Sequence, residues 1–251
     1  KVGEGTFGSV YRTKQFWDTA DTDQVVIKVL KDDPRVKTNF QTRVLAALPE
    51  AYALDRCSDH PRIIQLLDIT AASLPKKLIA FVLEDWGVDL RESMRHAPKT
   101  PEQVRDILCQ VIDGTAHLHK IGLIHADLKP SNILVVEGVA GLQCKISDLG
   151  SCVAAAEADR IAPPISVVLH EGIQLQTLYY RAPEIMFGST KFGVEIDAWS
   201  VGSIAAELAG FRFTNEKVCY MRRLFPAAGN PAMFCAAGVT ALAFRAASLQ
   251  T

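Results

Sequence analysis

The chain has 251 residues, of which 49% are hydrophobic and 22% are charged, a balance typical of globular proteins. Its formal net charge of −1 argues against nucleic-acid or membrane-surface binding. The six cysteines include no Cys-x-x-Cys pair and no signal peptide opens the chain, so we expect free thiols and a cytoplasmic or nuclear location. The longest apolar run, residues 232–244, is too short to span a membrane.

The first segment is rich in glycine. Gly3, Gly5 and Gly8 form a Gly-x-Gly-x-x-Gly pattern, whose missing Cβ atoms let backbone N–H groups approach phosphates closely. A Rossmann loop shares this pattern, but there a helix follows the glycines. Val10 and Tyr11 predict a second strand instead, so we expect a loop that joins two antiparallel strands.

A single lysine, Lys28, interrupts the next apolar run, residues 25–30. An isolated lysine in a strand can point to water from a sheet edge, whereas a buried ammonium group needs anions nearby. Only one glutamate, Glu50, lies between Lys28 and His60. Because Pro49 precedes it, we expect the helix there either to begin near Pro49 or to bend at that residue.

A capped helix leads into the most polar loop of the chain. The sequence Thr-Pro-Glu-Gln at 100–103 predicts a helix start, and apolar residues then recur at helical spacing to Gly122. The loop that follows lies between two apolar segments, residues 123–124 and 133–136. It carries four functional side chains: His125, Asp127, Lys129 and Asn132. Such residues also occur in simple turns, but an unpaired charge is costly in a core, so this loop is expected to face a binding site.

Two of the acids beyond this loop stand out. Asp148 ends another predicted strand. Asp197 lies in an otherwise apolar helix and needs hydrogen-bond partners there.

In order, these segments resemble the catalytic domain of eukaryotic protein kinases, from residue 1 to about residue 231. The motifs that carry the resemblance are the glycine loop at 3–8, Val-Val-Ile-Lys at 25–28, His-x-Asp-x-Lys-x-x-Asn at 125–132, Asp-Leu-Gly at 148–150, and Gln-Thr-Leu-Tyr-Tyr-Arg-Ala-Pro-Glu at 176–184. The last motif resembles the group that holds cyclin-dependent, MAP and dual-specificity-type kinases.

The resemblance implies a catalytic set. Asp127 would accept the proton of the substrate hydroxyl, and Lys129 would neutralise the transferring phosphoryl group. Lys28 would contact the ATP phosphates and pair with Glu50, while Thr177 would bond to Asp127 and Lys129. Two residues would hold Mg²⁺, namely Asn132 and Asp148. Arg181 would shape the substrate site, and Asp197 would anchor the backbone of the catalytic loop.

The resemblance also implies a set of nucleotide-binding residues: Val2, Gly3, Gly5, Gly8, Val10, Val26, Lys28, Leu83, Glu84, Trp86 and Leu134. Among these, Leu83 would be the gatekeeper, and the backbones of Glu84 and Trp86 would bond to adenine. Asp89 is a candidate for the ribose hydroxyls, although an acid at the start of a helix is an equally good interpretation.

The implied fold is α+β in two lobes. Residues 1–84 would form an antiparallel sheet with one helix, and residues 85–251 a mainly helical lobe, with ATP and Mg²⁺ between them. The first strand is expected to be cut short, and residues from about 232 diverge from the helices that should follow. We therefore expect a kinase domain truncated at both ends.

One departure concerns regulation. Ala126 occupies the place of the arginine that usually receives an activation-loop phosphate, and Gly172 occupies the usual phosphothreonine position. We therefore expect that loop phosphorylation does not activate this protein.

The expected function is transfer of the γ-phosphoryl group of ATP to a protein serine or threonine, because Asp-Leu-Lys-Pro-Ser-Asn at 127–132 resembles serine/threonine kinases. The expected partners are ATP and a protein substrate, without nucleic acid or membrane. Two alternatives stay open: a catalytically impaired pseudokinase that acts as a scaffold, and a small-molecule phosphotransferase that shares the His-x-Asp loop.

Overall fold

The computed structural model describes residues 3–4, 8–14, 24–30, 40–72, 78–139, 141–155, 175–187, 189 and 191–210. Two of the expected nucleotide-binding residues, Val2 and Gly5, lie outside these ranges, as does Gly172. Within them, none of the helices combines the length and apolarity needed to cross a bilayer.

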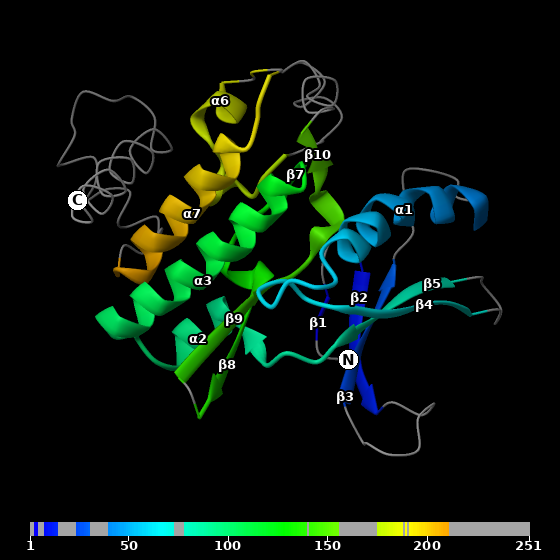
Figure 1. The fold of residues 1–251 in the computed structure, drawn as a ribbon, viewed down its shortest axis with the longest axis horizontal. Helices are drawn as coiled ribbons and strands as arrows, with labels where there is room; N and C mark the ends of the chain where they lie inside the picture. The colour runs from blue at the N-terminus through cyan, green and yellow to red at the C-terminus, as the bar shows by residue number, and fades with distance from the viewer. Residues whose placement is uncertain are drawn as a thin grey trace.

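The first part of the molecule is a five-stranded antiparallel sheet (Figure 1). Its strands, in spatial order, are β1 (Gly3–Glu4), β2 (Gly8–Lys14), β3 (Gln24–Leu30), β5 (Leu78–Glu84) and β4 (Leu66–Ala72). Because β1 pairs with β2, the glycine-rich segment joins two strands, as the sequence predicts. Lys28 lies on central strand β3, opposite Val10 of β2 and Phe81 of β5, so the edge-strand interpretation is wrong.

One helix, α1 (Phe40–Arg56), accompanies this sheet. The expectation that it begins near Pro49 is wrong, because the helix begins nine residues earlier and includes the proline. A proline inside a helix costs about 3 kcal/mol. Packing offsets that cost, since the part of α1 that contains the proline is buried on one face through Ala47, Glu50, Ala53 and Leu54.

Among its described residues, the second part has the helices α2 (Leu90–His96), α3 (Pro101–Lys120) and α7 (Glu195–Leu208), with α3 and α7 side by side (Figure 1). The predicted start of α3 is confirmed: Thr100 accepts a hydrogen bond from Gln103 N–H, and the Gln103 side chain accepts one from Thr100 N–H. The shorter elements among the described residues of this part are β6 (Val88–Asp89), β7 (Leu123–Ile124), η1 (Pro130–Asn132), β8 (Ile133–Gly138), β9 (Gly141–Ile146), η2 (Leu149–Ser151), β10 (Val153–Ala154), η4 (Leu178–Tyr180) and α6 (Pro183–Met186).

A continuous apolar core and a backbone bridge connect the two parts. Phe81 and Leu54 from the first part belong to the same buried cluster as Leu128 from the second. The segment that follows α1 in the sequence pairs with the end of β9. Ile146 donates its N–H to Arg62 O at 2.8 Å and accepts from Ile64 N–H at 2.9 Å. This pairing fixes the end of β9, from which Asp148 follows. The α+β architecture expected from the sequence is confirmed, whereas the boundary at residues 84 and 85 stays a prediction.

Candidate active site

The buried carboxylate of Asp197 binds the backbone of the polar loop that follows β7. Asp197 of α7 is 0% exposed and accepts hydrogen bonds from the backbone N–H groups of His125, at 2.7 Å, and Ala126, at 2.9 Å. His119 of α3 lies 2.9 Å from the same carboxylate. Ala126 has φ +59°, a left-handed conformation that alanine rarely adopts and that these bonds help to maintain. Asp197, the acid in an otherwise apolar helix, thus has the hydrogen-bond partners that the sequence predicts, and these bonds stabilise the backbone conformation of the loop.

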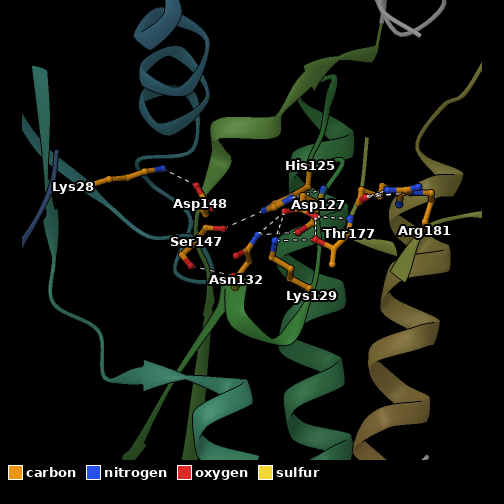
Figure 2. Close-up of polar contacts among 10 residues, drawn as sticks. Lys28, His125, Asp127, Lys129, Asn132, Ser147, Asp148, Thr177 and Arg181 are labelled. Atoms are coloured by element: carbon orange, nitrogen blue, oxygen red, sulfur yellow. Dashed lines mark hydrogen bonds and ion pairs between the residues drawn. The ribbon is translucent and has the colours of Figure 1, made fainter. Parts of the chain in front are cut away.

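Asp127 joins its own loop to the segment that contains Thr177 (Figure 2). Its Oδ1 accepts from the N–H and the hydroxyl of Thr177, at 2.9 and 2.7 Å, and its Oδ2 lies 2.5 Å from Lys129 Nζ. Lys129 Nζ also lies 3.0 Å from the Thr177 hydroxyl oxygen. The contacts expected of Thr177 are present, and a carboxylate fixed in this way can accept a proton from a nearby hydroxyl.

A second ion cluster centres on Lys28. Its Nζ lies 2.5 Å from Glu50 Oε1 and 2.6 Å from Asp148 Oδ1. Burial lowers the pKa of Lys28, but the two carboxylates outweigh it and leave the pKa raised. Burial raises the pKa of Glu50 more than Lys28 lowers it. For Asp148 burial also raises the pKa, but Lys28 outweighs it, so the pKa is lowered and the carboxylate is ionised at neutral pH.

The donor atoms fit a magnesium ion bound with a nucleotide. The amide nitrogen of Asn132 is used in a 2.9 Å bond to Asp127 O, so its side-chain oxygen is the atom it can offer to a metal. Asp148 adopts φ +59°, a left-handed turn at the end of β9. In the part of the chain that the structure describes, no group of three or more His, Cys, Asp or Glu side chains forms a metal site. Phosphate oxygens of a ligand would have to complete the coordination, as Mg²⁺ commonly requires.

The sheet brings several of the expected nucleotide-binding residues together. Val10 is the register partner of Lys28, and Val26 is the partner of Leu83. Gly8 lies against the next strand, where an added Cβ would come within 2.8 Å of Val29 O. Gly3 is placed in β1 and the half-buried Leu134 in β8.

Asp89 caps α2 by accepting from Glu92 N–H at 2.8 Å, so the helix-start interpretation holds. Ribose binding by Asp89 stays a prediction.

The structure adds polar residues that sequence reasoning missed. Lys145 is 6% exposed and contacts Glu84, Gln176 has φ +58°, and Arg12 forms an ion pair with Asp85. Lys145 carried the same signal as Lys28, a single lysine in an apolar strand. The other contacts join residues far apart in the chain, which no local pattern reveals.

The fold is α+β in two parts. The clusters around Asp127 and Lys28 bring together two lysines, two aspartates, a glutamate and an asparagine. This combination is typical of a nucleotide-binding protein of the phosphotransferase type. The family model described as protein kinase domain matches residues 1–219. The chain belongs to the protein kinase family, as the sequence motifs predict. The protein named Cyclin-dependent kinase F-3, from Oryza sativa subsp. japonica, is 31% identical over 210 residues. The aligned region is 83% of this chain and 42% of that relative.

Proposed function

We propose that this protein transfers the γ-phosphoryl group of Mg-ATP to a serine or threonine of a protein substrate. The observation that carries the proposal is the Asp127 carboxylate, which is held on one oxygen by Thr177 and on the other by Lys129. Asp148, which follows strand β9, supports it because it pairs with Lys28.

In this proposal Asp127 accepts the proton of the acceptor hydroxyl as its oxygen bonds to the γ-phosphorus and the bond to the β–γ bridging oxygen breaks. Lys129 offsets the negative charge on the transferring group. Lys28, oriented by Glu50, contacts the α- and β-phosphates. Bound Mg²⁺ would neutralise phosphate charge, with Asn132 and Asp148 as the protein ligands.

The choice of serine or threonine over tyrosine rests on Lys129. The Asp-Leu-Lys-Pro-Ser-Asn sequence that contains this lysine resembles the corresponding sequence of serine/threonine kinases. The lysine Nζ contacts both Asp127 and Thr177.

We expect a peptide library to separate this function from its alternatives. With Mg-ATP, the protein should label peptides that contain serine or threonine but not matched tyrosine peptides, and excess EDTA should abolish the labelling. Mass spectrometry of the products is the measurement. Phosphate transfer to free sugars instead of peptides would support a small-molecule phosphotransferase, and absence of transfer together with ATP binding would support the scaffold alternative.

The backbone beside Thr177 favours a particular neighbour of the acceptor residue. The Gln176 side chain is buried: Nε2 donates to Ile196 O and the Ser200 hydroxyl, each at 2.9 Å, and Oε1 accepts from Ala182 N–H at 3.0 Å. These bonds stabilise the left-handed backbone of Gln176. Its carbonyl oxygen accepts from Arg181 Nε at 3.2 Å and Nη2 at 2.8 Å.

This geometry has a consequence for substrate choice. With the acceptor hydroxyl at Asp127, to which Thr177 N–H bonds, the substrate residue after the acceptor would lie beside the neighbouring Gln176. A backbone N–H there would compete with Arg181 for the Gln176 carbonyl, and an N–H without a partner is costly. Proline has no N–H, so proline directly after the phosphorylated residue is the favoured neighbour.

We expect Ser-Pro peptides to be used with a kcat/KM about tenfold higher than matched Ser-Ala peptides, since an unpaired N–H costs about 1–3 kcal/mol. In Arg181→Met the Gln176 carbonyl is released and this ratio should fall toward one. Arg181→Lys, which keeps a donor, is the matched control. Because both peptides are compared on the same enzyme, a general loss of activity cancels. An unchanged ratio in Arg181→Met would contradict the proposal.

A further inference from the structure

The segment that joins the two parts of the molecule, residues 84–87, is held by a lysine from β9. Lys145 Nζ lies 2.5 Å from Glu84 Oε1, and the same oxygen accepts Gln65 N–H at 2.8 Å. The ammonium group also lies 4.2 Å from the centre of the Trp86 ring. Lys145 therefore contacts both residues whose backbones are expected to bond to adenine.

Burial makes these contacts strong. The Lys145 side chain is 6% exposed and that of Glu84 is 19% exposed, so little water screens their attraction. A desolvated ammonium over an aromatic face adds a second attraction. Lys145 is also three residues before Asp148 on the same stretch of chain, so it connects the adenine-binding segment to the strand that delivers the metal ligand.

An arginine from β2 holds the same segment at its other residues. Arg12 Nε lies 2.5 Å from one Asp85 oxygen and Arg12 Nη2 lies 3.0 Å from the other, while Nη2 also donates to Gly87 O at 3.3 Å. Gly87 itself is packed against β8: it has φ +60°, and an added Cβ would lie 2.1 Å from Val135 O. The four residues of the segment are thus held by contacts with three strands: Glu84 and Trp86 with β9, Asp85 with β2, and Gly87 with β2 and β8.

We propose that Lys145 is a positioning residue for the adenine end of ATP, and that Arg12 supports it. Neither side chain needs to touch the nucleotide; they act by holding the backbones of Glu84 and Trp86 at the spacing that adenine requires. The inference rests on the proposed function. Nucleotide affinity then depends on these cations, whereas the phosphoryl-transfer step, which depends on Asp127 and Asp148, does not.

The test compares wild type with Lys145→Met and Lys145→Arg. In Lys145→Met we expect KM for ATP to rise about tenfold while kcat stays within about twofold, because binding that is equal in ground and transition states affects KM alone. Arginine keeps the charge and stacks on aromatic rings, so Lys145→Arg should restore KM to within about threefold of wild type. Arg12→Gln, at a half-exposed position, should raise KM about threefold even if Lys145→Met fails to fold.

Two competitive inhibitors distinguish positioning from general damage. Adenosine should bind Lys145→Met about tenfold more weakly, while inorganic tripolyphosphate, which lacks the base, should inhibit both proteins equally. Equal weakening of both inhibitors, or an unchanged adenosine constant in both Lys145→Met and Arg12→Gln, would overturn the inference. Calorimetric binding of adenosine needs no protein substrate, so failure of the proposed function, seen as adenosine binding without phosphate transfer, is distinguishable from failure of the positioning role.

Discussion

Replacement of Asp148 by asparagine should reduce phosphate transfer by about 10²–10³-fold, the range seen when one charge-stabilising group is removed from an active site. Asp148 lies 2.6 Å from Lys28, and this contact keeps its carboxylate ionised. An asparagine has nearly the same shape but no charge, so it would bind Mg²⁺ poorly and would leave Lys28 with one counter-ion instead of two. The measurement is the initial rate of peptide phosphorylation at saturating Mg-ATP.

The control for this change is Asp106→Asn, at an exposed position on α3. It removes the same charge and should leave the rate within about twofold, because exposed charges contribute little. A thermal unfolding curve for each variant separates lost chemistry from lost structure. If Asp148→Asn retained the wild-type rate, a scaffold role without catalysis would be the better description of the chain.

The second large effect is on stability. Asp197→Ala should lower the free energy of unfolding by about 2–5 kcal/mol, because it leaves the N–H groups of His125 and Ala126 buried without an acceptor, at about 1–3 kcal/mol each. The loop that carries Asp127 depends on these bonds, so phosphate transfer should fall in the same variant. Urea unfolding at neutral pH measures the first effect, and the peptide assay measures the second.

Glu195→Ala provides the matched control, since Glu195 begins the same helix but is exposed. Its unfolding free energy should remain within about 0.5 kcal/mol of wild type. An Asp197→Ala protein that unfolded at the same urea concentration as Glu195→Ala would show that the buried carboxylate is not what holds the loop.

Sequence patterns predicted the parts of this molecule where local chemistry decides the outcome. These parts are Lys28 in an apolar strand, the threonine cap of α3 and the polar loop around Asp127. Of the two alternatives that Pro49 leaves open, a helix start near the proline is wrong, because tertiary packing overrides this strong local signal. Local preference cannot show that the helix face around Pro49 will be buried against the rest of the fold.

The contacts missed from sequence are those between residues far apart in the chain. Lys145 meets Glu84 across 61 residues and Arg12 meets Asp85 across 73. The strained backbone of Gln176 also gave no sequence signal, because glutamine is not a residue that usually marks a left-handed conformation. Such features depend on how strands and loops are assembled, which a single sequence without its relatives does not specify.

The close approach of Gly87 to β8 also limits natural variation at this position. Every single-nucleotide change that replaces a glycine codon by another amino acid introduces at least a Cβ atom, and here that atom would overlap the Val135 carbonyl. Selection should therefore remove missense alleles at residue 87 in populations that depend on this protein. The next residue, Val88, has an exposed side chain and should accept exchange freely.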